Sequence, residues 1–350
     1  MDIEILVWLT AIPFLIHLIS VNINLGTSIT SFLFRYYYGD LALAKKLAMI
    51  ALAGEFVSGT LGTILTVILA GIWTPLMNIA GNILYIPLLI ALLGIAFRLP
   101  SIGGYWYTLE RGGSLNILFG ILMIVGGFMI PYGFRYIFAF IDYPVGLESL
   151  NPLKGDIYGV LANPLFPPRY ILSIILILIV GFSITLLYVY RGHSNIQRHL
   201  IKYIFIFVIL YTTSNIWLTI EYSRYASYLY NIFILSGHIT FYTYILSWIS
   251  IFIFTIILYR DHKFNDLSFP IAYIVLPIST LITIEFTYNY SRFPYFVITG
   301  DSGIDAIYFI NRSFVASFQE ILAIYLLIMS VAIVAIVGIY LLIVKNFFTG

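Results

Sequence analysis

Nine long apolar stretches dominate this sequence, and they constrain its fold more than any other feature. A helix that crosses a bilayer needs roughly 20 predominantly apolar residues. Stretches of this length are typical of membrane α-helices and are too long for the strands of a membrane β-barrel. We predict helices near residues 4–34, 43–71, 76–97, 114–139, 169–190, 200–220, 229–259, 268–287 and 313–345. The sequence thus predicts an all-α integral membrane protein, a single domain over 1–350 with about nine transmembrane helices.

The composition agrees with this class and excludes others. Only 9% of the residues are charged, whereas a soluble domain has about 25%. The net charge of +2, without basic runs among aromatics, gives no sign of nucleic-acid binding. The absence of cysteine excludes disulfides, iron–sulfur clusters and thiolate-bound or covalently attached haem. Abundant isoleucine and tyrosine with little glutamine fit a thermophile.

Lysine and arginine are shared unequally between the two sets of predicted loops. One set contains Arg35, Lys45, Lys46, Arg98, Arg111, Arg191, Arg198, Lys202, Arg260, Lys263 and Lys345. The other contains Arg135, Lys154, Arg169, Arg224, Arg292 and Arg312. Because cytoplasmic loops carry the excess of these residues, we predict an N-terminus outside and a cytoplasmic C-terminus in a multi-pass protein of the cell membrane.

Two connections on the predicted outer side are long enough to fold, at residues 140–168 and 288–312. We expect them to form structured caps. The sequons at Asn289 and Asn311 lie on this side, although such tripeptides often occur by chance. We expect no internal repeat and no separate soluble domain.

Two of the five histidines, His17 and His238, fall inside predicted membrane helices. An ionisable residue in hydrocarbon is a candidate functional residue, and neutral imidazole is the usual axial ligand of b-type haem. We therefore predict both as candidate ligands of haem iron. The alternative is a hydrogen bond to a neighbouring helix, for which Ser236 and Thr240 lie close to His238 in the sequence.

Three carboxylates also lie within predicted membrane helices: Glu55, Glu285 and Glu320. Each costs about 2.5 to 3.5 kcal/mol on insertion scales, so each needs a cation, a proton or a function. Glu285, Asn289 and Arg292 recur on one helical face, which ends in an arginine suited to a haem propionate. The alternative is a structural contact between Glu285 and Arg292.

Three short motifs follow one another along the chain. His17 precedes Leu25-Gly26, Leu161-Ala162-Asn163-Pro164 precedes the helix at 169–190, and Tyr290-Ser291-Arg292-Phe293-Pro294-Tyr295 precedes the last helix. Together they resemble subunit I of the cytochrome bd oxidases, quinol oxidases with three haems near the outer face. The resemblance implies nine helices, an outer N-terminus, haem b and other membrane subunits as partners.

The sequence also departs from that family's pattern. Leu172 stands where the family has a second haem-binding histidine, and Thr240 falls near its methionine ligand. The stretch 87–99 lacks the proton-donating glutamates, and Asn289 replaces another glutamate. The quinol-binding loop shrinks to about residues 222–225. The resemblance therefore implies one haem at most, bound by His17 alone or by His17 and His238 from both sides.

The sequence thus predicts a cytochrome bd-like membrane subunit that binds haem b and takes part in respiratory electron transfer within a larger oxidoreductase complex. One alternative is a haem-free structural partner subunit of a terminal oxidase. Another is a divergent quinol oxidase catalytic subunit with a rebuilt quinone site. The last is a proton-coupled transporter that uses Glu55, Glu285 and Glu320, although transporters usually show repeats and broken helices.

Overall fold

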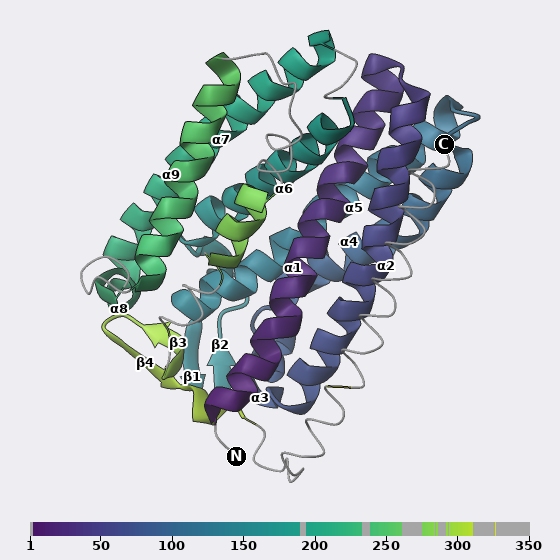
Figure 1. Cartoon of the computed structure of the whole chain (residues 1–350). Helices are drawn as coiled ribbons and strands as arrows, with labels where there is room; N and C mark the ends of the chain where they lie inside the picture. The colour runs from purple at the N-terminus through teal and green to yellow at the C-terminus, as the bar shows by residue number, and fades with distance from the viewer. Residues whose placement is uncertain are drawn as a thin grey trace.

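A computed structural model of the chain describes residues 3–189, 194–232, 239–260, 275–283 and 294–310, with the single residues 285, 292 and 326. Long helices run between two ends of the molecule, and four short strands lie together at one end (Figure 1). The strands are the only β-structure in the described ranges. The predicted all-helical membrane architecture is therefore observed in this part of the chain.

The first half consists of two helical hairpins. Its elements are α1 (Ile3–Leu33), the π-helical turn η1 (Phe34–Tyr38), α2 (Leu41–Gly71), the short α3 (Thr74–Asn82), α4 (Tyr85–Thr108) and α5 (Gly113–Asp142). The side chain of Asp40 caps α2 by accepting a hydrogen bond from the backbone N–H of Leu43 at 2.9 Å, which satisfies one of the unpaired amides at the helix start. α1 lies beside α2 (Figure 1), and α4 packs against α5.

The second half begins with another hairpin. Its helices are α6 (Phe166–Val189), α7 (Ser194–Tyr225), α8 (Ser227–Tyr230) and α9 (Ile239–Arg260). α7 packs against both α6 and α9 (Figure 1). Residues 275–283 are also helical.

Both expected outer caps are folded where the structure describes them. β1 (Leu147–Leu150) pairs with β2 (Leu153–Gly155), and a 3-10 turn, η2 (Gly159–Ala162), follows. β3 (Tyr295–Thr299) pairs with β4 (Ser302–Asp305), and η4 (Ala306–Phe309) follows. Phe296 of β3 stacks on Trp73 with ring centroids 5.0 Å apart, which anchors this cap to the start of α3.

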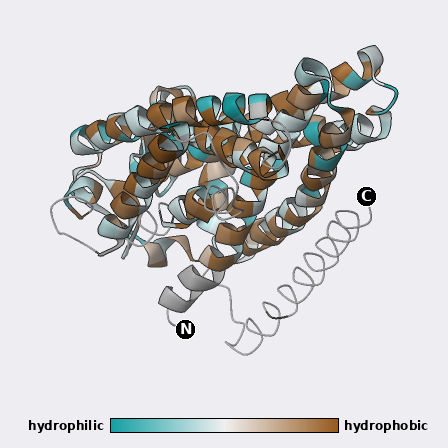
Figure 2. Cartoon of the chain, turned by 45° about the horizontal axis from the view of Figure 1, so that its top comes forward, coloured by the Kyte–Doolittle hydropathy of each residue, from teal (hydrophilic) through white to brown (hydrophobic). Residues whose placement is uncertain are grey.

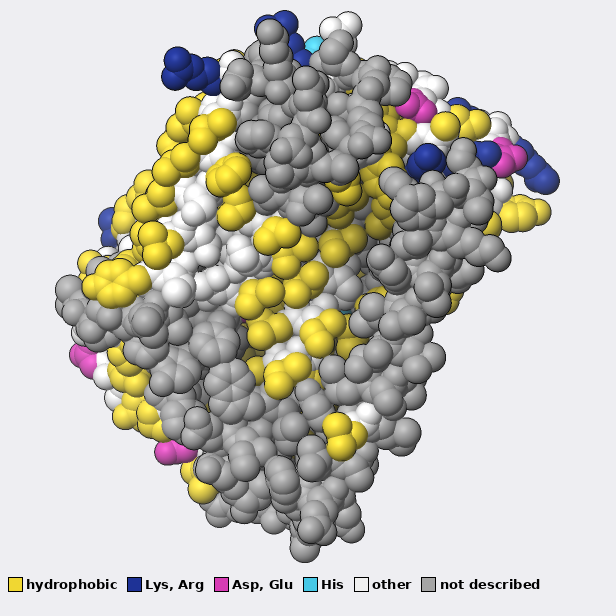
Figure 3. Space-filling view, in the orientation of Figure 1, with side chains coloured by type: hydrophobic (Ala, Val, Ile, Leu, Met, Phe, Trp, Pro, Cys, Tyr) yellow, Lys and Arg dark blue, Asp and Glu magenta, His cyan; other side chains and the backbone are white. Residues whose placement is uncertain are grey.

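Six helices within the described ranges are long and apolar enough to span a membrane. They are Thr10–Tyr38, Leu41–Gly71, Tyr85–Thr108, Gly113–Asp142, Phe166–Val189 and Asn195–Tyr225. Hydrophobic residues dominate these helices (Figure 2), and hydrophobic side chains cover much of the coloured surface (Figure 3). The chain is therefore a multi-pass membrane protein. The total of nine helices remains a prediction, because the expected span 313–345 lies outside the described residues apart from residue 326.

The predicted span at 76–97 is wrong in its boundaries. The chain forms α3 first, and α4 then continues through Pro100, Gly103 and Gly104 to Thr108. Proline and glycine are tolerated inside membrane helices because neighbouring groups compensate for the backbone they disturb. Gly104 leaves room for the ring of Phe119, because a Cβ at this position would lie only 2.8 Å from that ring. Consequently Arg98, predicted to lie in a loop, lies inside a helix and is only 1% exposed.

The two halves meet where Gly26 of α1 crosses Gly181 of α6. A Cβ on Gly181 would lie 2.4 Å from the backbone of Gly26, so only glycine permits this approach. Both glycines begin the same pattern, Gly-x-Ser-Ile-Thr, at 26–30 and 181–185. In both copies the serine and threonine are buried and donate to carbonyls of the preceding helical turn.

The similarity continues into the following helices. The buried residues of α2 and α7 correspond at a constant separation: Ala44 and Gln197, Leu47 and Leu200, Ala48 and Ile201, Ala51 and Ile204. The two hairpins therefore share a local similarity at the crossing glycines and a similar burial pattern in the helices that follow.

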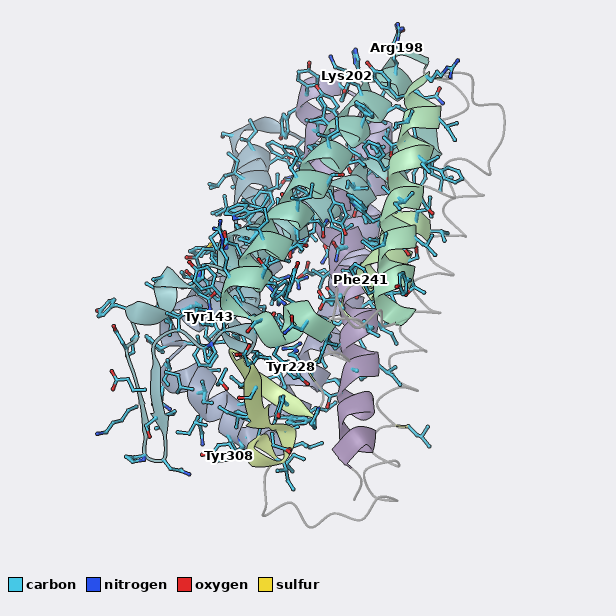
Figure 4. All side chains as sticks on the ribbon, turned by 90° about the vertical axis from the view of Figure 1, so that its left-hand side faces the viewer. Tyr143, Arg198, Lys202, Tyr228, Phe241 and Tyr308 are labelled. Carbon is cyan, nitrogen blue, oxygen red and sulfur yellow. The ribbon has the colours of Figure 1, made fainter. Side chains whose placement is uncertain are left out.

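The two ends of the molecule differ in their polar residues. The basic residues Arg198 and Lys202 lie at one end. The tyrosines Tyr143, Tyr228 and Tyr308 lie at the other end, with the strands (Figure 4). Arg98, Arg135, Arg169 and Arg292 were assigned to loops, but they form ion pairs within the fold and no longer count toward the orientation. The predicted orientation now depends on the remaining basic residues. It still places the strands outside, because most of those residues lie in the other set of connections.

Candidate functional site

His17 lies in α1 with its ring against α2. Its Nδ1 is 2.9 Å from the carbonyl oxygen of Ser58, so in this arrangement Nδ1–H donates and Nε2 carries the lone pair. A Cβ on Gly62 would lie 3.1 Å from Cε1 of the ring, which shows how closely the α2 backbone passes. The predicted alternative for His17, a hydrogen bond to a neighbouring helix, is thus present.

Glu55 of α2 has the cation that its burial requires, and that cation is Arg98 of α4. The Nε of Arg98 donates to Oε2 of Glu55 at 2.7 Å. The other guanidinium nitrogens donate to the side chains of Asn24 and Ser28 and to the carbonyl of Met123. Every nitrogen of this buried guanidinium therefore has a partner, as a charge inside a membrane protein requires.

Asn24 connects these groups. Its Nδ2 donates to Oε2 of Glu55 at 2.6 Å and lies 3.3 Å from the hydroxyl of Ser58, whose carbonyl holds His17. We call His17, Asn24, Glu55, Ser58 and Arg98 the inner polar cluster. Sequence reasoning found His17 and Glu55 but missed Arg98, because Gly and Pro downstream of it suggested a loop. A lone arginine in an otherwise apolar stretch was the available signal.

A second cluster lies at the ends of α5, α6 and α7. Asp142 is 0% exposed and accepts hydrogen bonds from Arg169 and, at 2.7 Å, from the hydroxyl of Tyr222. Arg292 lies 3.4 Å from the other oxygen of Asp142, and Arg135 pairs with Glu285 at 2.6 Å. We call Arg135, Asp142, Arg169, Tyr222, Glu285 and Arg292 the outer ion-pair cluster. Burial lowers the pKa of Arg292, and the charge of Asp142 opposes that shift.

Glu285 and Arg292 each pair with a residue of α5, namely Arg135 and Asp142. Their predicted role toward a haem propionate stays a prediction. Neither α5 residue was a sequence candidate, because both were read as loop or helix-end residues. The remaining predicted site residues, His238, Asn289 and Glu320, lie outside the described residues.

The described residues can be tested against a b-type haem. The Nδ1–H bond of His17 suits a haem ligand, since metal-binding histidines usually donate their other N–H to a carbonyl or carboxylate. A Cβ placed on Gly62 would lie 3.9 Å from Nε2, which is an ordinary van der Waals distance. The arginines of the two polar regions pair with Glu55, Asp142 and Glu285.

Two helical glycines lie at close helix contacts. A Cβ on Gly54 would meet Asn24 at 2.9 Å, and one on Gly126 would meet the carbonyl of Gly94 at 2.6 Å. These glycines therefore permit close helix packing at these positions. Within the described ranges, no group of three or more His, Cys, Asp or Glu residues is placed to hold a metal. Haem binding by His17 therefore stays a prediction.

The whole chain can be compared with known proteins. It matches a solved chain described as "The structure of bd oxidase from Geobacillus thermodenitrificans", with a TM-score of 0.77 and 14% sequence identity. The match covers 100% of this chain and 99% of that one. The chain has the bd oxidase fold. No protein-family model and no curated protein sequence matches it.

The bd oxidase fold confirms the predicted resemblance at the level of architecture, and the structure gives its motifs local reasons. Gly26 of the Leu25-Gly26 pair allows the crossing with Gly181. Asn163 of the Asn-Pro motif accepts from the N–H of Leu165 at 2.9 Å and donates to the carbonyl of Tyr143 at 2.8 Å, which shapes the entry into α6. These motif residues therefore have structural roles in this chain.

Proposed function

We propose that this chain is a membrane subunit of a bd-type oxidase complex in the cell membrane, and that it supports the complex while a partner subunit carries the haem chemistry. The observation that carries this proposal is the pairing of the candidate ligands. Across a complete bd oxidase fold, His17, Glu55, Glu285 and Arg292 are each held by a protein group. Such pairing holds neighbouring helices together, and it engages these groups in structural contacts.

The connection between α7 and α8 supports the same proposal. α7 ends at Tyr225 and α8 begins at Ser227, so only Ala226 joins them. A long outer loop of the kind that the family uses for quinol has no room at this position. We propose that quinol, if the complex uses it, binds to a partner subunit.

A second candidate function is haem b binding by His17, with electron transfer through this chain. The Nδ1–H bond to Ser58 favours it, because that bond leaves Nε2 as the nitrogen for iron. A transporter is less well supported, since Glu55 and Glu285 each form an ion pair with an arginine.

A visible absorption spectrum separates these functions. The chain is purified alone and within its native complex, and reduced-minus-oxidised spectra are recorded for wild type and His17→Gln. We expect no b-type band from the isolated chain, and unchanged haem content per complex in the variant. A band in the isolated chain that disappears in His17→Gln would establish the second candidate.

Activity of the complex provides the other half of the test. Oxygen consumption with a quinol is expected from the complex and not from the isolated chain, and His17→Gln is expected to retain it. A complex that contains no haem, or that consumes no oxygen with any quinol, would contradict membership of a bd-type oxidase.

A further inference from the structure

A pocket of about 740 Å³ lies at the end of the molecule with the strands, and no residue of either charged cluster lines it. One wall is a face of α3, which contributes Thr74, Asn78 and Asn82 at four-residue intervals. The turn between β1 and β2 and the end of η4 form the opposite side. This volume is within the range of ligand-binding pockets, roughly 300–1,000 Å³.

The polar groups that line this pocket are all uncharged. They are the side chains of Thr74, Asn78, Asn82, Asn151 and Tyr308. Between them lie aliphatic residues, including Ile79, which is 2% exposed, and Leu150. No lysine, arginine, histidine, aspartate or glutamate is among the described lining residues. The pocket therefore combines neutral hydrogen-bonding groups with an apolar floor.

This lining selects a class of ligand. A charged group would lose water without gaining a countercharge, and a purely apolar group would leave amides without partners. The side chains of Asn78 and Asn151 and the hydroxyl of Tyr308 form no hydrogen bond within the described structure. An amide both donates and accepts, so neighbouring asparagines suit a ligand with several adjacent hydroxyls.

The position of the pocket indicates the source of such a ligand. The membrane helix α2 ends at Gly71, only three residues before Thr74. The pocket therefore opens at the level where lipid headgroups surround the hydrocarbon core. We propose that it binds the neutral, polyhydroxylated headgroup of a membrane glycolipid, and this does not depend on the function proposed above.

Native mass spectrometry of the delipidated protein tests this site. The probes are diglucosyl-diacylglycerol, phosphatidylcholine and free maltose. We expect the glucolipid to bind more tightly than phosphatidylcholine, and Asn78→Leu/Asn151→Leu to weaken it about tenfold through lost hydrogen bonds. Asn231→Leu is the matched control, because Asn231 is exposed and does not line the pocket.

Each other result overturns the proposal. Equal binding of both lipids would mean that the headgroup is not recognised, and equal weakening in Asn231→Leu would mean that the site lies elsewhere. Tight maltose binding without lipid preference would assign the pocket to a free sugar instead. Should the leucine variant fail to fold, Asn151→Asp at the exposed turn replaces it, and unchanged glucolipid binding in that variant overturns the proposal.

Discussion

Arg98 of α4 and Glu55 of α2 form an ion pair at 2.7 Å that has no counterpart in the second hairpin of the fold. The buried positions that correspond to Asn24 and Glu55 there are Ile179 and Val208, which are 0% and 1% exposed. The same helix packing is thus achieved once with charged and amide groups and once with aliphatic side chains. The hairpin geometry itself does not require the ion pair.

Breaking this pair from one side is expected to destabilise the protein strongly. Arg98→Met leaves the Glu55 carboxylate buried without its cation, and loss of one partner of such a pair costs about 3–5 kcal/mol. The double variant Glu55→Leu/Arg98→Met is expected to recover most of this loss, since both charges are removed together. Thermal unfolding in detergent, followed by circular dichroism, measures all three proteins. A double variant no more stable than Arg98→Met would show that the hairpin does need its charges.

Gly181 is expected to tolerate no side chain. In Gly181→Ala the new Cβ would lie 2.4 Å from the backbone of Gly26, and backbone cannot move aside as a flexible side chain can. Overpacking typically costs about 1–3 kcal/mol, and a backbone contact belongs at the upper end of that range. Gly59→Ala is the matched control, because a Cβ at Gly59 meets nothing within 4 Å. The fraction of monodisperse protein after heating is the measurement, and equal fractions for the two variants would contradict the close crossing.

Lys45 and Glu110 form an exposed pair whose contribution depends on pH. Lys45 lowers the pKa of Glu110 below its ordinary value of 4.5 by a hydrogen bond and by its charge. Because the folded-state pKa is lowered, the stabilisation is present above the ordinary pKa and disappears as pH falls through the lowered value. The unfolding midpoints of wild type and Lys45→Met are therefore expected to differ slightly at neutral pH and low salt, and to converge in acid. A difference that grows in acid would have the wrong sign.

The sequence predicted the class of fold because apolar length is a strong signal. Apolar segments this long cross a membrane as helices, and most predicted boundaries lie within a few residues of those observed in the described helices. The error at α4 arose because Pro100, Gly103 and Gly104 suggest a loop in a water-soluble context. The close approach of Gly26 and Gly181 was not predicted, because nothing in the local sequence indicates which glycines meet across helices.

The site was less predictable. A polar residue in an apolar segment indicates that it needs a partner, but the sequence does not show which residue that partner is. His17 and Glu55 were identified from their isolation in apolar surroundings. Their partners are a backbone carbonyl on α2 and an arginine forty-three positions away, and no local pattern encodes either contact. The bd oxidase resemblance supplied the fold, while the pairing came from the structure alone.

Asp142 is expected to be the most sensitive residue of the outer ion-pair cluster. Asp142→Asn keeps the shape of the side chain but removes a charge that faces both Arg169 and Arg292, leaving two buried cations close together. We expect a loss of about 3 kcal/mol or more in unfolding free energy, as for other buried pairs deprived of one partner. Asp301→Asn is the matched control, because Asp301 is exposed, accepts from Ser227 at 2.5 Å and is expected to change stability by about 0.5 kcal/mol at most. Thermal unfolding of both variants compares them directly. Similar losses would mean that the cluster is hydrated and that its charges are held by water instead of by each other.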